Sequence, residues 1–206
     1  MTETLAGWVA AISAWEVAGV VLAIAYLLLA VRQSLWCWYA ALASTTIYLF
    51  LFADARLYME SALQLFYMAM AVYGWVQWRY GGPLGTGRKV GLWSWRAHAM
   101  TVVSVLVLTG LSGWLLTRYT AAELPYTDSF TTWASLVATW MVARKLLENW
   151  VYWFVIDAVN IYLYLSRELY LTALLFAAYL VIIIFGFIAW RRDWRGQHPQ
   201  PDRAAG

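Results

Sequence analysis

Long apolar runs separated by short polar breaks are the main feature of this 206-residue chain. Each run has about the 20 residues that a helix needs to cross the hydrocarbon core of a bilayer. Charged side chains such as Arg32, Asp54 and Arg79 lie at the breaks rather than inside the runs. The pattern predicts seven membrane-spanning helices, over residues 15–31, 35–52, 57–78, 100–116, 126–142, 149–165 and 169–190.

Composition supports a membrane protein and narrows its function. Hydrophobic residues make up 64% of the chain and charged residues 12%, against about half and about a quarter in a soluble domain. Seven spans leave room only for loops and tails, so we expect no nucleotide-binding domain and no ATP-driven pump. The formal charge of +3 is too small to indicate nucleic acid binding. A phosphate-binding loop is excluded because Arg88 follows Gly87 where that motif needs Lys.

The basic residues are unevenly distributed between the two predicted faces of the membrane. Of 14 Lys and Arg residues, eleven fall on the face that carries the loop 80–99 and the tail 192–206. The positive-inside rule makes that face cytoplasmic, so the N-terminus is expected outside and the C-terminus inside. Residues 1–14 are too short to span and are expected to form a peripheral amphipathic segment. The tail is expected to be disordered.

An internal repeat relates the third predicted span to the seventh. At a spacing of 112 residues, seven positions of the third span meet an identical residue: Leu57, Tyr58, Leu63, Tyr67, Gly74, Trp78 and Arg79. Arg32 meets Arg144 at the same spacing, whereas Ile47 meets Ile161 at a spacing of 114. Chance matching of apolar residues does not explain a Gly-x-x-x-Trp-Arg sequence at both helix ends.

The repeat predicts the architecture of an all-α polytopic membrane protein. Residues 15–79 and 126–191 each form a three-helix repeat, and a linker helix over 100–117 lies between them. One extra crossing gives the second repeat the same orientation as the first, so the two repeats are expected to be parallel. This three-plus-one-plus-three order is one architecture of membrane transporters, with the substrate between the repeats near mid-bilayer.

Asp157 is the ionisable residue placed deepest in any predicted span. A carboxylate there costs about 2.5–3.5 kcal/mol on insertion scales, so it usually faces a cavity or a partner. Helical spacing puts Trp150, Trp153 and Asn160 on the same face, with Asn149 at its edge. Two indoles beside a carboxylate and an amide suit a flat cationic ring. Alternatively, a protonated or hydrogen-bonded Asp157 ties helices together and the tryptophans belong to the interfacial belt.

Only the second half of the chain carries this charge. At the spacing of 114, Ala43 occupies the place of Asp157 and Thr46 that of Asn160. We therefore expect one cationic ligand per chain rather than two.

Other side chains could line the same cavity. Gln64 is an amide that needs partners in lipid, so it is expected to face protein or a cavity. Tyr179 matches Tyr67 in the repeat, and the two rings could face each other across a pore or pack in the core. The hydroxyl groups of residues 44–46 could line the cavity or satisfy backbone carbonyls.

Several chemistries lack the residues they require. His98 and His198 are expected in loops without a second ligand at metal spacing, so no metal site is predicted. Both lysines lie at loops, which excludes a retinal Schiff base inside the last span. No nucleophile–base pair is evident, so we expect neither an enzyme nor a bound cofactor.

Two stretches of the chain resemble PnuC-type vitamin transporters. The first half carries Arg32-Gln33-x-x-Trp36-x-Trp38, and Leu63-Gln64-Leu65-Phe66 leading to Tyr73-Gly74-Trp75-x-x-Trp78. The second half carries Glu148-Asn149-Trp150-Val151-Tyr152-Trp153 and then Glu168-Leu169-Tyr170. The resemblance covers residues 15–195 in order, and Asn-Trp-x-x-Trp is a specific element of it.

The resemblance implies a fold related to the sugar-transporting SWEET proteins, commonly assembled as a homotrimer in the bacterial cell (inner) membrane. It implies facilitated diffusion of a vitamin precursor, which a cytosolic kinase traps by phosphorylation. Nicotinamide riboside is the best-known substrate, and relatives carry thiamine or riboflavin. The match makes these residues ligand-contacting or pore-lining: Gln64, Asn149, Trp150, Trp153, Asp157 and Asn160.

We therefore expect a uniporter for a cationic aromatic vitamin, nicotinamide riboside first and thiamine second. The vitamin ring would stack on the two tryptophans, with Tyr67 and Tyr179 completing the site. Some nicotinamide riboside carriers have Asn at the place of Asp157, so the resemblance leaves the vitamin open. The rival hypothesis is a seven-helix receptor or scaffold that binds its ligand without transporting it.

Overall fold

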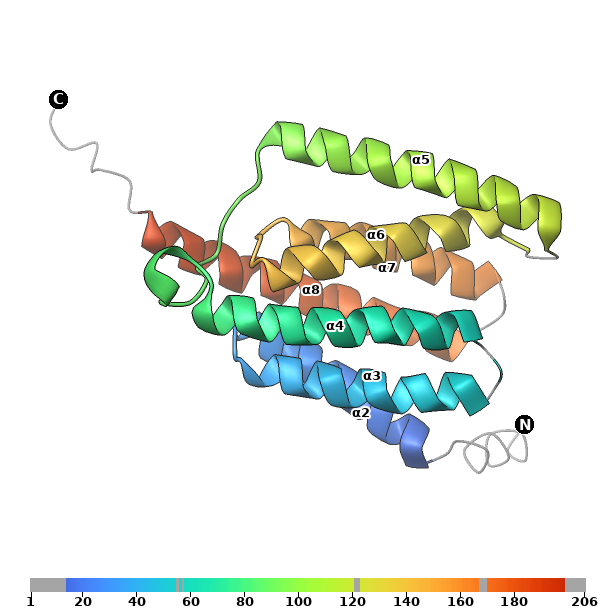
Figure 1. Cartoon of the computed structure of the whole chain (residues 1–206), viewed down its shortest axis with the longest axis horizontal. Helices are drawn as coiled ribbons and strands as arrows, with labels where there is room; N and C mark the ends of the chain where they lie inside the picture. Colours follow the sequence, from blue (N-terminus) through green and yellow to red (C-terminus); the bar gives the residue numbers. More distant parts are fainter. Residues whose placement is uncertain (1–13, 55, 57, 121–122, 167–169, 199–206) are drawn as a thin grey trace, which may run out of the picture. The chain divides into compact units, whose positions relative to one another are not determined.

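Seven α-helices and one short 3-10 turn make up the part of the chain that the computed structural model describes, residues 14–54, 56, 58–120, 123–166 and 170–198 (Figure 1). The helices are α2 Ala14–Val31, α3 Trp36–Asp54, α4 Tyr58–Tyr80, α5 Trp95–Tyr119, α6 Pro125–Ala143, α7 Asn149–Ser166 and α8 Tyr170–Gln197. Each of the seven predicted spans coincides with one of them. The predicted peripheral segment lies outside the described residues, except for Ala14.

Four of these helices are apolar enough to cross a membrane by length and composition alone: α2, α3, α5 and the Thr172–Gln197 part of α8. The other three are as long as α2 or longer, but polar side chains such as Gln64, Thr139 and Asp157 interrupt their apolar runs. A helix satisfies its own backbone hydrogen bonds, as a membrane-spanning segment must. The predicted all-α polytopic fold class is confirmed.

Helices α5 and α8 extend furthest beyond their predicted bounds. Helix α5 begins at Trp95 because the Ser94 hydroxyl accepts a hydrogen bond of 3.3 Å from the Ala97 N–H and caps the helix. His98 therefore lies in the first turn of α5, and its placement in a loop was wrong. Helix α8 continues to Gln197, so the tail predicted to be disordered is helical up to that residue. Arginine is a good helix former, and no Gly or Pro interrupts the helix there before position 196.

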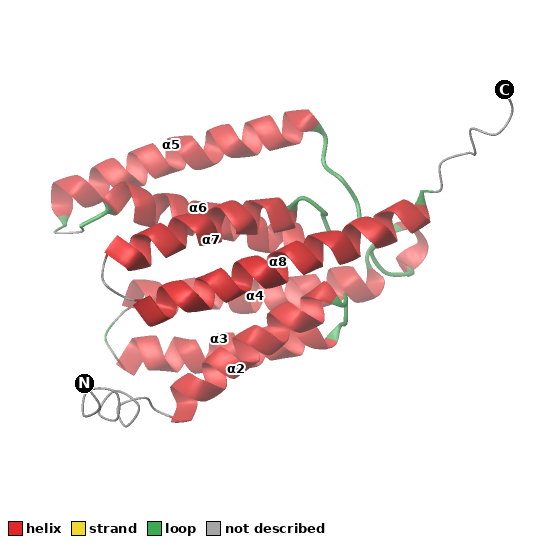
Figure 2. Cartoon of the chain, turned by 180° about the vertical axis from the view of Figure 1, so that it is seen from behind, coloured by secondary structure: helices red, strands yellow, loops and turns green. Residues whose placement is uncertain are grey.

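The described residues up to Thr86 form the first compact unit, in which α3 packs against both α2 and α4 (Figure 2). Ser44 on α3 donates a hydrogen bond of 2.9 Å to the Gly19 carbonyl on α2. Ser61 on α4 donates one of 3.0 Å to the Leu49 carbonyl on α3. Both bonds join small buried residues to a neighbouring backbone, which is typical of helix packing in membranes.

The described residues from Gly87 onward form the second compact unit, in which α7 packs against α6 and α8 while α5 packs against α6. The segment before α5 is attached to the turn between α6 and α7. The Gly91 N–H donates to the Lys145 carbonyl at 3.0 Å, and the Leu147 N–H donates to the Gly91 carbonyl at 2.9 Å. The linker helix therefore belongs to the second unit, while the finer predicted domain boundaries stay predictions.

The predicted repeat is visible first in the turns that follow α2 and α6. Gln33 and Lys145, which are 112 residues apart, both adopt a positive φ, at 53° and 50°. In each turn the next N–H donates a 3.0 Å bond to the carbonyl five residues before it. This is the Schellman arrangement, which satisfies the last carbonyls of a helix.

The repeat continues in how the middle helix of each unit packs on the last one. A buried Trp lies over a Gly and edge-on against a second Trp: Trp38 on Gly74 and Trp78, and Trp150 on Gly186 and Trp190. The ring centroids are 5.2 and 5.4 Å apart, with interplanar angles of 83° and 90°. The same packing motif therefore occurs in both units at the same spacing.

A single spacing of 112 holds throughout the repeat, so the spacing of 114 was wrong for α3 and α7. The ends of α2 and α6, the ends of α3 and α7, and the starts of α4 and α8 are all 112 residues apart. Thr45 rather than Ala43 is therefore the counterpart of Asp157, and Tyr48 is the counterpart of Asn160. The conclusion that only the second half carries the charge is unchanged.

Replacing Gly186 by Ala is expected to destabilise the protein by about 1–3 kcal/mol, the usual cost of overpacking a core. An added Cβ would lie under 3.0 Å from the Trp150 ring, which Trp190 contacts edge-on. Thermal unfolding in detergent measures the effect. The matched control is Gly110→Ala on α5, where nothing lies within 4 Å of the Cβ position, and stability should be unchanged or slightly higher. Equal melting temperatures for the two variants would contradict the packing described here.

Candidate substrate site

Helix α7 carries most of the predicted site residues, and the turn before it fixes where the helix begins. The Asn149 backbone N–H donates to the Leu146 carbonyl at 3.2 Å, and the Asn149 side-chain Nδ2 donates to the same carbonyl at 2.5 Å. The Asn149 side chain is fully buried, and its Oδ1 accepts no hydrogen bond from any described residue. One half of the amide therefore holds the turn, and the other half is a buried acceptor.

The two tryptophans of α7 have different neighbours. Trp150 is only 2% exposed and packs on α8 through Gly186 and Trp190, with its indole Nε1 unpaired among the described residues. Trp153 is partly buried and packs against an apolar cluster of α5, α6 and α7 that includes Val105 and Ala134. Both side chains have a structural neighbour without any ligand, and their stacking on a vitamin ring stays a prediction.

Asp157 lies in the middle of α7. Two ring contacts fix the register of the antiparallel helices α7 and α8: Trp150 with Trp190 at 5.4 Å, and Tyr164 with Phe176 at 5.0 Å. Asp157 is midway between these contacts on α7, as Ile183 is on α8. Tyr179 is one turn from Ile183 and contacts Phe176 at 5.4 Å. The register therefore brings Asp157 and Tyr179, both predicted site residues, to neighbouring turns of two packed helices.

The Asp157 carboxylate is buried without a partner in its own unit. Its side chain is 4% exposed, and among the described residues of the second unit it accepts no hydrogen bond and forms no ion pair. Asn160, one turn further along α7, is partly buried. A buried carboxylate is stable only when it is protonated or when a cation or a hydrogen-bond donor reaches it. At this position, beside Asn160, the Asp157 carboxylate therefore needs a proton, a cation or a hydrogen-bond donor.

The predicted residues of the first unit lie on α4, where Gln64 and Tyr67 are both partly buried. The Tyr67 ring contacts Phe66 at 5.7 Å. The Thr45 and Thr46 hydroxyl groups of α3 donate to carbonyls of their own helix at 2.8 and 2.7 Å. For these two threonines the structure favours backbone satisfaction over a cavity-lining role.

A polar cluster between the starts of α5 and α7 was missed in the sequence. Glu148 Oε1 accepts a hydrogen bond of 2.9 Å from the Trp93 N–H and lies 3.4 Å from His98 Nε2. His98 Nδ1 lies 3.0 Å from the Tyr152 hydroxyl. The signal that could have revealed it is Ser94, whose capping position places His98 in the first turn of a helix. Across the described ranges, no three His, Cys, Asp or Glu side chains are placed to hold a metal ion.

Comparison with known proteins identifies the family. Residues 13–192 match the family described as nicotinamide mononucleotide transporter. The chain is 26% identical over 187 residues to the riboflavin/roseoflavin transporter RibM of Streptomyces davaonensis, covering 87% of each chain. It is 22% identical over 200 residues to the nicotinamide riboside transporter PnuC of Escherichia coli, covering 85% of this chain and 84% of that protein.

The fold is also that of a solved structure. The crystal structure of the vitamin B3 transporter PnuC superposes with a TM-score of 0.66 at 23% identity, covering 86% of this chain and 80% of the other. The family match includes both three-helix repeats and the linker helix. The chain therefore belongs to the nicotinamide mononucleotide transporter family, a family of PnuC-type membrane vitamin transporters.

Proposed function

We propose that this membrane vitamin transporter is a facilitator for a flat aromatic precursor that carries a positive charge, nicotinamide riboside first and thiamine second. The observation that carries the proposal is the buried Asp157 carboxylate, which has no partner among the described residues of its own unit. A cationic ring placed beside it offsets the cost of burying the charge. Family membership supports transport as the activity, and the name of the Escherichia coli relative supports nicotinamide riboside.

The roles of the site residues follow from their chemistry. Asp157 offsets the positive charge of the vitamin ring, and the Asn160 amide, one turn away, hydrogen-bonds a polar group of the vitamin. Asn149 offers its unpaired Oδ1, and Trp150 offers its unpaired indole N–H rather than a ring face, because its ring packs on α8. Trp153 is the better candidate for stacking. The remaining members of the proposed site are Gln64 and Tyr67 on α4 and Tyr179 on α8.

A riboflavin carrier is the alternative to a carrier of a cationic vitamin, because the chain is 26% identical to a riboflavin/roseoflavin transporter. Riboflavin has no positive charge at neutral pH, so it would leave an ionised Asp157 without a counter-charge. A protonated Asp157 could instead donate a hydrogen bond to a ring carbonyl of riboflavin. The two candidates therefore differ in the protonation state that they require of one residue.

The proposed transport is diffusion down a gradient, with a cytosolic kinase trapping the product. The eleven basic residues on one face support an N-terminus outside and a C-terminus in the cytoplasm. Alternating access would arise from rocking of one unit against the other, in a chain assembled as a homotrimer. Because the segment before α5 is bonded to the second unit, α5 would move with that unit.

Sealed vesicles that contain the protein, a vitamin kinase and ATP are expected to accumulate labelled nicotinamide riboside or thiamine. Vesicles without the kinase should only equilibrate, because a facilitator supplies no energy of its own. Uptake is measured by filtration, with protein-free vesicles as the control. Saturable binding without entry into the vesicles would favour the receptor or scaffold hypothesis.

Asp157→Asn is expected to weaken binding of the cationic vitamin by more than tenfold, which is above about 1.4 kcal/mol. The amide keeps the size of the side chain but removes the negative charge that attracts the ring. Calorimetric titration of the purified protein measures the change. The control is Asp54→Asn, the same substitution at an exposed position at the end of α3. Unchanged affinity of Asp157→Asn for the cationic vitamins would contradict the role proposed for Asp157. If the protein bound riboflavin and neither cationic vitamin, the riboflavin carrier would be favoured.

Leucine substitutions are expected to separate stacking from packing. Trp153→Leu should weaken vitamin binding about tenfold or more, since stacking of a cationic ring on an indole contributes about 2 kcal/mol when desolvated. Trp150→Leu and its repeat counterpart Trp38→Leu should lower the melting temperature by similar amounts, because both remove the same buried contact. Trp150→Leu should weaken binding less than Trp153→Leu does, because it removes one hydrogen bond and no stacking contact. A Trp150→Leu variant that matched Trp38→Leu in stability but lost ten times more affinity than Trp153→Leu would reverse the assignment of the two indoles.

A further inference from the structure

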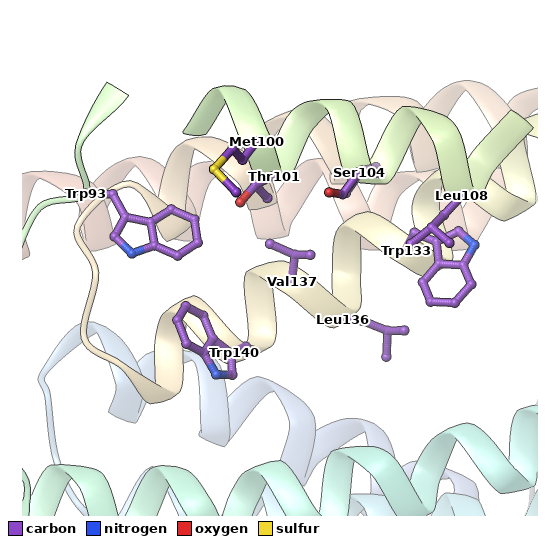
Figure 3. A pocket seen from close by; sticks show the side chains of 10 residues that line it. Trp93, Met100, Thr101, Ser104, Leu108, Trp133, Leu136, Val137 and Trp140 are labelled. Carbon is purple, nitrogen blue, oxygen red and sulfur yellow. The ribbon is translucent and has the colours of Figure 1, made fainter. Parts of the chain in front are cut away.

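An apolar groove of about 500 Å³ runs between α5 and α6 (Figure 3). Trp93 and Trp140 form one end of it, and Leu108 and Trp133 form the other. The Trp133 indole is held in place by a hydrogen bond of 3.1 Å from its Nε1 to the Ser112 hydroxyl. The groove is therefore bounded by fixed aromatic rings at both ends.

The groove runs along about a third of α5. Its wall on α5 runs from Met100 to Leu108, a rise of about 12 Å at about 1.5 Å per residue. Ser104 lies in the middle of this wall, and Figure 3 shows its side chain directed toward the space above α6. Val103 and Val107, beside it on the same helix, are 59% and 54% exposed, as side chains that contact lipid are. An apolar channel of this length at membrane depth suits an acyl chain.

The Trp140 end of the groove is basic. The Arg144 guanidinium lies 5.2 Å from the centroid of the Trp140 ring, one turn beyond the groove. Arg96, in the first turn of α5, lies 5.9 Å from the ring of Trp95, which is 74% exposed and typical of an interfacial aromatic residue. The Trp93 ring lies 5.5 Å from the Trp140 ring, so the segment before α5 contacts the last turn of α6 at this end of the groove.

We propose that this groove is a binding site for an anionic phospholipid. One acyl chain lies between α5 and α6 along Ser104, and the phosphate lies at Arg144 and Arg96. Basic pockets between membrane helices bind anionic lipid headgroups. An apolar groove with a basic end suits a phospholipid better than a purely apolar ligand, because only the phospholipid has a negative charge to place at the basic end. No residue that lines the groove belongs to the proposed vitamin site, so the proposal holds whichever vitamin is carried.

Thiol labelling tests the acyl-chain position. The native Cys37 is buried, so Ser104→Cys introduces an accessible thiol into the groove with little change in size. In nanodiscs of phosphatidylglycerol this thiol is expected to react at least threefold more slowly with a membrane-permeant maleimide than in nanodiscs of phosphatidylcholine. Val103→Cys, on the exposed face of the same helix, is the matched control and should react equally in both lipids. Equal reaction rates for Ser104→Cys in the two lipids would overturn the proposal. A disulfide between two copies of Ser104→Cys would also overturn it, because a second copy of the chain would then cover the groove.

Lipid retention measured by native mass spectrometry tests the headgroup position independently of labelling. The wild-type protein, offered both lipids in equal amounts, is expected to retain phosphatidylglycerol at least fivefold over phosphatidylcholine. Arg144→Gln should abolish the preference, and Arg96→Gln should reduce it. Arg32→Gln, the repeat counterpart of Arg144 in the first unit, should retain it. Equal retention of both lipids by the wild type, or equal loss in the Arg32 and Arg144 variants, would contradict the site.

Discussion

In each three-helix repeat an indole of the middle helix packs directly over a glycine of the last helix, and the orientation of the middle helix depends on this contact. Trp150 can approach α8 only because Gly186 has no side chain, and the edge-on contact with Trp190 fixes the rotation of α7. Asp157 follows Trp150 by seven residues, so the two side chains project within about 20° of each other around the helix. The contact that stabilises the unit therefore also determines where the buried carboxylate points.

The two units share this packing of Trp over Gly but carry different polar groups on the middle helix. Thr45 and Asp157 occupy equivalent positions, but the Thr45 hydroxyl is a donor and can bond the Ala41 carbonyl of its own helix at 2.8 Å. A carboxylate has no proton to donate when ionised, and the N–H groups around it are already used by the helix. Asp157 must therefore find its partner outside α7, whereas Thr45 does not. The asymmetry that the sequence shows as one charge becomes, in the structure, a buried carboxylate that no described residue of its own unit bonds.

Features that depend on local properties could be predicted from the sequence. Hydropathy locates the seven helices, and the pairs of Gly and Trp at a spacing of 112 reveal the repeat, because both signals are contained in short stretches of chain. The neighbours of an aromatic ring are not a local property, so the sequence could not distinguish Trp150, packed on α8, from Trp153, packed on the α5 side. His98 was misplaced because its polar surroundings are typical of a loop, while its real neighbours, Glu148 and Tyr152, are about 50 residues away.

The attachment of α5 to the second unit constrains how this transporter can move. Backbone bonds join Gly91 to the turn after α6, and Glu148 accepts from the Trp93 N–H, so the helix that links the repeats is not an independent tether. The two units divide after Thr86, next to Gly85 and Gly87, which adopt φ values of 68° and 91°. Glycine reaches this region of φ without the steric cost that other residues meet. The rocking motion proposed above would therefore change backbone angles near this boundary, while the hydrogen bonds that hold the segment before α5 to the second unit are retained.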